Sequence, residues 1–120
     1  MKKFIITAAL VITSFVIQAQ EFIQSKYMDV GTWNTYTRTW DWEARKYCDV
    51  GFLLQGNTIV ANDIAKSSYY TYETLDGTYP TVSWKALDEQ RRECRIIMKF
   101  FEDYSYFIVM YDDFCYRYVY

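Results

Sequence analysis

The chain has 120 residues, of which 52% are hydrophobic and 21% aromatic, and its formal net charge at pH 7 is −2. It contains no histidine, which excludes Ser-His-Asp and Cys-His nucleophile pairs and His-ligated zinc sites. The one basic cluster, at Arg91, Arg92 and Arg95, is interrupted by glutamates, whereas a nucleic-acid-binding protein needs clustered cations to neutralise phosphates, so no nucleic-acid partner is expected.

Residues 1–19 are predicted to be a secretory signal peptide. Lys2 and Lys3 precede an apolar run that extends to Ile17, and a short, weakly polar stretch follows. The run is shorter than the roughly 20 apolar residues that a membrane-spanning helix needs, so we expect cleavage and no stable membrane span afterwards. Residues 20–120 would then form a single β domain in the periplasm or outside the cell, with eleven basic and fifteen acidic side chains.

Alternation of apolar and polar residues with period two predicts β-strands in the rest of the chain. Residues 32–46 are rich in Thr, Trp and Tyr and are expected to form the first long strand. In residues 47–54 every second side chain is apolar, beginning with Cys48. The following Gly56–Asn57 pair predicts a hairpin turn, with the partner strand at residues 58–64.

The central part of the chain contains one ambiguous segment. A strand is predicted to end in a turn at Asp76–Gly77, and Pro80 can stand only at the start or edge of a strand. Residues 84–101 contain good helix formers with apolar residues at helical spacing, but Arg91 would lie inside the apolar stripe of that helix. Two strands joined by a turn at residues 88–92 are therefore favoured, and a helix is the alternative.

The C-terminal part is predicted to form three antiparallel strands, at residues 93–101, 104–111 and 114–120. The acidic pairs 102–103 and 112–113 would occupy the turns, and the frequent charges rule out a spanning helix. The middle strand is apolar on both faces, which is typical of a central strand covered on both sides. We therefore predict an all-β fold: a small, single-domain antiparallel barrel or sandwich of seven to eight short strands.

The carboxylates and cysteines suggest no catalytic or metal site. The acidic residues occur as neighbours along strands or turns, whereas a glycosidase needs two carboxylates that face each other across a cleft. Three cysteines without Cys-x-x-Cys spacing do not provide the four ligands of a structural zinc ion. We expect no catalytic residues, no metal and no cofactor, and therefore a protein that is not an enzyme.

The cysteines also allow a prediction about disulfide bonding. Cys48 and Cys94 each share a strand face with apolar residues, whereas Cys115 shares its face with Arg117. A Cys48–Cys94 disulfide is the best of the three pairings, and it would stabilise the fold by about 4 kcal/mol in the chain-entropy model. The alternative is three free thiols packed as small apolar side chains.

The aromatic residues are the one feature that suggests recognition. Tyr and Trp provide large, rigid contact surfaces in protein interfaces and can stack on sugar rings, although in strands they often serve only packing. The densest groups lie in the predicted first strand, at Tyr69, Tyr70 and Tyr72, and at the C-terminus. The candidate binding residues are Trp33, Tyr36, Trp40, Trp42, Tyr116 and Tyr118.

Several short motifs recur in a known group of proteins. They are "WDWE" ahead of a cysteine, a hairpin with "GNTI", "WKALDE" followed by "CRI", and a final Tyr-x-Tyr-Val. With these motifs the chain resembles a family of small exported proteins from Bacteroidetes bacteria and their phages. The resemblance implies a β-rich domain without an assigned activity and carries over no functional residue. Family members typically have Asp-Gly or Asn-Gly where residues 89–92 read "EQRR".

These observations lead to three functional hypotheses. The first is an exported, non-enzymatic interaction module that binds a cell-envelope or extracellular protein through an aromatic-rich face. The second is a carbohydrate-binding β domain that stacks sugars on its tryptophans. The third is a small outer-membrane strand protein, because aromatic residues alternate up to the C-terminus; against it, such strands need about 9–11 residues each.

Overall fold

A computed structural model describes residues 20–62 and 66–120. The expected signal peptide at residues 1–19 lies outside the described residues, as does part of the predicted strand at 58–64. In the two described ranges every regular element is a β-strand. The strands are β1 (Gln20–Gln24), β2 (Tyr27–Asn34), β3 (Thr39–Trp42), β4 (Lys46–Tyr47), β5 (Gly51–Gln55), β6 (Thr58–Ala61), β7 (Ser68–Asp76), β8 (Thr81–Asp88), β9 (Glu93–Phe100), β10 (Ser105–Met110) and β11 (Phe114–Val119).

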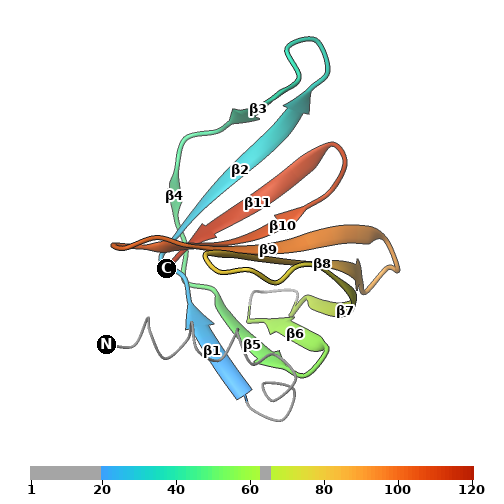
Figure 1. Ribbon diagram of the computed structural model, residues 1–120. Coiled ribbons are helices and arrows are strands. Elements are labelled where there is room, and N and C mark those ends of the chain that lie inside the picture. Colours follow the sequence, from blue (N-terminus) through green and yellow to red (C-terminus); the bar gives the residue numbers. More distant parts are fainter. Residues whose placement is uncertain (1–19, 63–65) are drawn as a thin grey trace.

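The strands form one antiparallel sheet that follows the chain as a meander. From β5 to β11 each strand pairs with the next, and the full order is β1-β5-β6-β7-β8-β9-β10-β11-β2-β3, with β4 also paired to β2. In Figure 1, β8 to β11 and β2 fan across the centre, with β5 and β6 below them. The predicted all-β, single-domain antiparallel architecture is confirmed.

The first strand joins the two ends of this meander. β1 pairs with β5 and β2 pairs with β11, yet only Ser25 and Lys26 separate β1 from β2. At the bend, the Ser25 N–H donates to the Val50 carbonyl at 2.9 Å, and the Lys26 N–H donates to the Val119 carbonyl at 3.0 Å. The Ser25 hydroxyl also donates to the Val50 carbonyl at 2.7 Å. The sheet thus closes on itself, because β1 covers the edge that β5 would otherwise expose and β2 covers that of β11.

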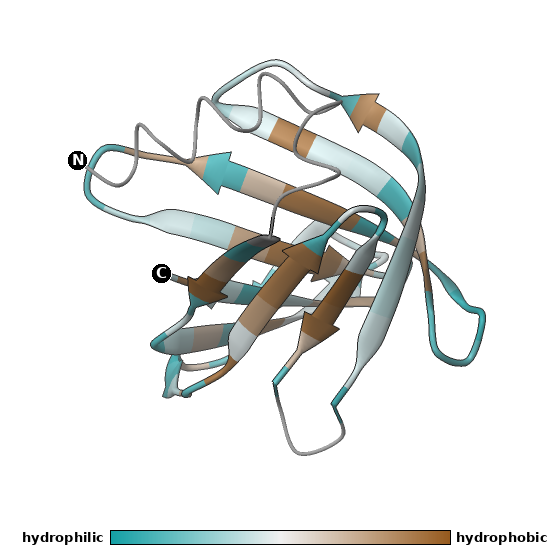
Figure 2. Cartoon of the chain, turned by 90° about the horizontal axis from the view of Figure 1, so that it is seen from below, coloured by the Kyte–Doolittle hydropathy of each residue, from teal (hydrophilic) through white to brown (hydrophobic). Residues whose placement is uncertain are grey.

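The interior of this closed sheet is apolar. Paired residues on neighbouring strands point to the same face, and the inward positions of β5 to β11 are occupied mainly by aliphatic and aromatic side chains. Phe52 on β5 and Phe107 on β10 are fully buried and stack with ring centroids 4.2 Å apart, while Tyr118 meets Phe52 edge-on at 4.8 Å. Figure 2 shows the strands, with their brown apolar segments, arranged around this common interior.

The C-terminal half agrees closely with the sequence prediction. β8 and β9 are joined by a turn at residues 89–92, so the ambiguous segment consists of two strands and is not a helix. β9, β10 and β11 lie within two residues of their predicted bounds, and the acidic pairs lie in the turns between them. Ile108 points outward from β10 and is only 6% exposed, so the middle strand is covered on both faces as predicted.

The prediction of one long strand over residues 32–46 is wrong. This stretch ends β2, turns at residues 35–38 and returns as β3. Asn34 causes the turn, because its side-chain oxygen accepts hydrogen bonds from the Tyr36 N–H at 2.9 Å and the Thr37 N–H at 3.2 Å. Arg38 completes it with a positive φ of 56°. The described ranges contain eleven strands, above the expected seven to eight. The additional strands come from the separate β1 and β2 and from the short β3 and β4.

Within the described ranges, the chain has no helix with the length and hydropathy needed to cross a membrane.

Candidate functional site

The outer face of the sheet carries a row of aromatic rings. Trp33 on β2 and Trp40 on β3 are opposite each other in register, and their rings meet edge to face with centroids 5.2 Å apart. Trp42 follows on the same face of β3, with its ring centroid 6.3 Å from that of Trp40. The β2–β3 hairpin thus brings together three of the residues that the sequence suggested for binding.

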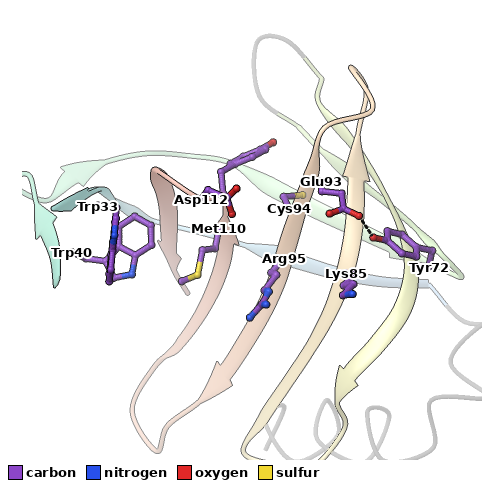
Figure 3. A pocket seen from close by; sticks show the side chains of 10 residues that line it. Trp33, Trp40, Tyr72, Lys85, Glu93, Cys94, Arg95, Met110 and Asp112 are labelled. Atoms are coloured by element: carbon purple, nitrogen blue, oxygen red, sulfur yellow. Dashed lines mark hydrogen bonds between the residues drawn. The ribbon is translucent and has the colours of Figure 1, made fainter. Parts of the chain in front are cut away.

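A groove of about 380 Å³ begins at this tryptophan pair and extends across β10, β9 and β8. Figure 3 shows Trp33 and Trp40 at one end and Tyr72 at the other, with Met110, Arg95 and Lys85 between them. The volume lies within the range typical of sites that hold a small ligand or a few side chains of a partner. The groove is lined by Trp33, Trp40, Tyr72, Lys85, Glu93, Cys94, Arg95, Met110, Tyr111 and Asp112.

Two cations lie side by side in the floor of the groove. Lys85 on β8 is directly opposite Arg95 on β9, and Arg95 is directly opposite Met110 on β10. Lys85 forms a long ion pair with Glu73, in which its Nζ lies 3.7 Å from a carboxylate oxygen. At the far end, the Tyr72 hydroxyl donates a hydrogen bond of 2.6 Å to Glu93, which raises the pKa of Tyr72 to about 12.

A buried carboxylate holds the neighbouring part of the outer face together. The Asp29 side chain on β2 is 4% exposed and accepts hydrogen bonds from Arg45 Nε and Nη2 and from Arg117 Nε, each at 2.9 Å. The Arg117 guanidinium in turn lies 3.8 Å from the Trp42 ring centroid and 4.8 Å from that of Tyr106. The hydrogen bonds from Arg45 and then Arg117 outweigh the effect of burial and lower the pKa of Asp29.

Close packing at Gly31 sets the position of Trp42. A Cβ atom at Gly31 would lie 2.9 Å from Trp42 Cζ3 and 3.1 Å from the Cys115 sulfur. The absence of a side chain therefore lets the Trp42 ring lie against the sheet, with the Arg117 guanidinium packed on the ring. Trp42 is 39% exposed and is not one of the residues that line the groove.

The other sequence candidates lie elsewhere. Tyr36 is 96% exposed at the tip of the β2–β3 hairpin, away from the groove lining. Tyr116 is half-buried and packs against the apolar core, and the Tyr118 ring is 8% exposed inside the closed sheet. Both point inward because they pair with Val109 and Phe107, which are inward residues of β10. The C-terminal tyrosines therefore do not share a surface with the tryptophans.

The groove includes residues that sequence reasoning did not select. Lys85, Arg95, Met110 and Asp112 were not proposed for binding, and Tyr72 appeared only as one member of a dense tyrosine group. Arg95 is exposed and alternates along β9 with the buried Cys94 and Ile96, so the period-two pattern of the sequence assigns it to the outer face. The alternation pattern does not show which residues of the neighbouring strands lie next to Arg95.

All three cysteines carry free thiols in the structure, so the expected Cys48–Cys94 bridge is not formed. Cys48 lies outside the strands, where its N–H donates to the Lys26 carbonyl and its sulfur lies 3.4 Å from the Ser25 hydroxyl. Cys94 is the second residue of β9 and lies directly opposite Ala86 in the core. Burial raises the pKa of both Cys94 and Cys115 to about 11.

We therefore predict three titratable thiols on the denatured, unreduced protein. Under native conditions at pH 8, Cys48 should react first, because it is the most exposed and the other two thiols are buried with raised pKa values. Timed labelling with iodoacetamide followed by peptide mass spectrometry measures this order. A single titratable thiol after denaturation would show that a bridge forms.

Among the described residues, no group of three or more His, Cys, Asp or Glu side chains is placed to hold a metal ion. Comparison of the chain with protein-family models, with curated proteins and with solved structures gave no match. Any functional conclusion must therefore come from the groove and its surroundings.

Proposed function

We propose that the protein is an exported, non-enzymatic interaction module that binds a cell-envelope or extracellular protein through the groove and the adjoining tryptophans. These three tryptophans, Trp33, Trp40 and Trp42, are called the tryptophan wall. The observation that carries this proposal is the combination of Trp33, Trp40, Tyr72, Met110 and Arg95 in one groove. Trp, Tyr, Met and Arg are the residue types enriched in protein interfaces, and Trp, Tyr and Arg dominate their hot spots.

The surroundings support a protein partner. The hairpin that carries the tryptophans projects beyond the sheet (Figure 1) and exposes Tyr36 at its tip, which offers contact area outside the groove. In protein interfaces, the residues that contribute most to affinity are surrounded by a rim of contacts that excludes water. A groove of this composition, with polar and aromatic residues around it, matches that arrangement. The groove itself would hold one or two anchoring side chains of the partner.

A carbohydrate ligand is the second candidate, favoured by the tryptophan pair. Sugar rings stack on open aromatic faces, but Trp33 and Trp40 are both half-buried and meet edge to face, so each covers part of the other. Titration with neutral and acidic glycans, followed by tryptophan fluorescence, separates the two candidates. We expect no change in emission with neutral glycans at millimolar concentration, and saturable changes with them would favour the carbohydrate function.

Site-specific photocrosslinking tests the protein-binding function. A photoreactive phenylalanine analogue replaces Trp40 in the groove or, as the control, Tyr70, which is 52% exposed on β7 outside the groove lining. In envelope and secreted fractions of the source cells, we expect one discrete crosslinked protein at position 40 and none at position 70. Crosslinking should decrease when Trp33 is also replaced by alanine. Equal crosslinking at both positions, or none at position 40, would contradict the proposal.

A further inference from the structure

The cation pair in the groove floor is unfavourable for the isolated fold. Like charges directly opposite each other on neighbouring strands destabilise a sheet, and Lys85 and Arg95 hold such positions on β8 and β9. Lys85 is partly compensated by Glu73. The exposed Arg95 side chain has no hydrogen bond or ion pair with any residue in the described ranges, although Glu93 and Asp112 also line the groove.

An uncompensated arginine in an aromatic groove suits a carboxylate. The guanidinium presents a planar fork of donors that can bind both oxygens of a carboxylate, and such charge-assisted bonds are stronger than neutral ones. Lys85, on one side of Arg95, adds positive charge, while Met110 on the other side offers an apolar, adaptable surface that continues toward Trp33 and Trp40. The groove therefore offers a cationic half next to an apolar half.

We propose that the groove binds an acidic side chain of a partner protein, with its carboxylate on Arg95 and a neighbouring apolar side chain against Met110, Trp33 and Trp40. This inference rests on the proposed protein-binding function and specifies the chemistry of the partner segment. An acidic glycan offers the carboxylate but no aliphatic or aromatic side chain for Met110. Because both halves of the groove need a matching group, an acidic–apolar peptide segment fits it better.

Peptide selection with a double-mutant cycle tests this inference. Random dodecapeptides displayed on phage are selected on the purified protein, and enriched peptides are synthesised with each Asp or Glu intact or replaced by Asn or Gln. We expect enriched peptides to carry an acidic residue next to an aromatic or aliphatic one. Arg95→Gln should weaken their binding about tenfold or more, in line with the loss of a charge-assisted hydrogen bond.

The cycle also shows whether the two charges meet. Replacing the peptide carboxylate should weaken binding to the wild-type protein, but it should have little further effect on Arg95→Gln. Lys99→Gln is the matched control, because Lys99 is an exposed cation on the same strand that does not line the groove. It removes the same charge and should leave peptide affinity within about twofold of the wild type.

The possible results separate this inference from the function on which it rests. Enriched peptides without acidic residues that still require Trp40 would overturn the carboxylate assignment and leave protein binding intact. Equal affinities of Arg95→Gln and wild type for acidic peptides would do the same. If no peptide is enriched and position 40 gives no crosslink, both proposals fail. Saturable binding of polygalacturonate in the absence of any peptide binding would also overturn both.

Discussion

Replacement of Phe107 by alanine should lower the free energy of unfolding by about 3–5 kcal/mol, the usual range for truncating a buried phenylalanine. Phe107 is fully buried on β10 and stacks on Phe52 of β5, with ring centroids 4.2 Å apart. These two strands are far apart in the sheet order, so the contact crosses the interior and ties the two sides of the closed sheet together. Its removal leaves a cavity that the surrounding rigid strands cannot fill.

Urea denaturation followed by circular dichroism measures this loss. Phe101→Ala is the matched control, because it makes the same chemical change at a residue that is 42% exposed and directly follows β9. It should cost less than about 1 kcal/mol, as surface substitutions usually do. Phe107→Leu, which fills most of the space, should lie between the two. Equal losses for Phe107→Ala and Phe101→Ala would show that the Phe52–Phe107 stack is not the centre of the core.

The faces of the strands were predictable because burial acts on each residue locally. In β9 the alternation puts Cys94 on one face with the apolar Ile96 and Met98, and all three are buried in the structure. Arg91 also distinguished correctly between a helix and two strands for residues 84–101, because a helix would have buried its charge and a turn does not. A period-two pattern is reliable where one face of a strand is packed and the other is wet.

The stretch at residues 32–46 shows where this reasoning fails. Its Thr, Trp and Tyr residues have high β-propensity throughout, so composition gave one strand where the chain forms two. The turn depends on Asn34, whose side chain replaces the backbone acceptor for two N–H groups. A lone Asn among strand-forming residues is a weak turn signal, and no glycine marks this turn.

The groove could not be predicted from the sequence because it depends on register between distant strands. Trp33 and Trp40 were selected by residue type, and the β2–β3 hairpin places them together. Arg95 gained its significance only from Lys85 and Met110 beside it, and those contacts follow from the pairing of β8, β9 and β10. The pairing of β11 with β10 places Tyr116 and Tyr118 on the inner face, which residue type alone does not reveal.

Replacement of Asp29 by asparagine should lower the free energy of unfolding at pH 7 by about 2–3 kcal/mol, because it leaves two arginines without their shared anion. Asp29 is almost fully buried and is bonded to both Arg45 and Arg117. Arg45 is 47% exposed and can be hydrated, whereas Arg117 is only 23% exposed and lies between Trp42 and Tyr106. The uncompensated Arg117 therefore accounts for most of the expected cost.

Loss of this carboxylate should also loosen the tryptophan wall. Arg45 precedes β4, and its bond to Asp29 holds the segment that follows β3 against β2. We expect Trp42 to become more accessible, with a red-shifted tryptophan emission and stronger quenching by acrylamide. Asp103→Asn is the control, because Asp103 is an exposed turn carboxylate on the same molecule. It should change neither stability nor emission.

The pH dependence of stability gives this prediction a second measurement. The hydrogen bonds from Arg45 and Arg117 hold the folded-state pKa of Asp29 below its ordinary value of 3.8. Its contribution is therefore complete above the pKa of the unfolded chain, near 4, and is lost as the pH falls through the lower folded-state value. The stability difference between wild type and Asp29→Asn should be largest at pH 7 and should shrink below about pH 4.

The comparison isolates Asp29 from the second carboxylate with a lowered pKa. Burial tends to raise the pKa of Asp88, but hydrogen bonds from the Arg92 N–H, the Tyr111 hydroxyl and the Arg92 side chain outweigh it. Asp88 loses its contribution on acidification in both proteins, so it cancels in the difference. A difference that stays constant from pH 7 to pH 3 would show that the asparagine acts by altered packing, and the two arginines would then not depend on the charge of Asp29.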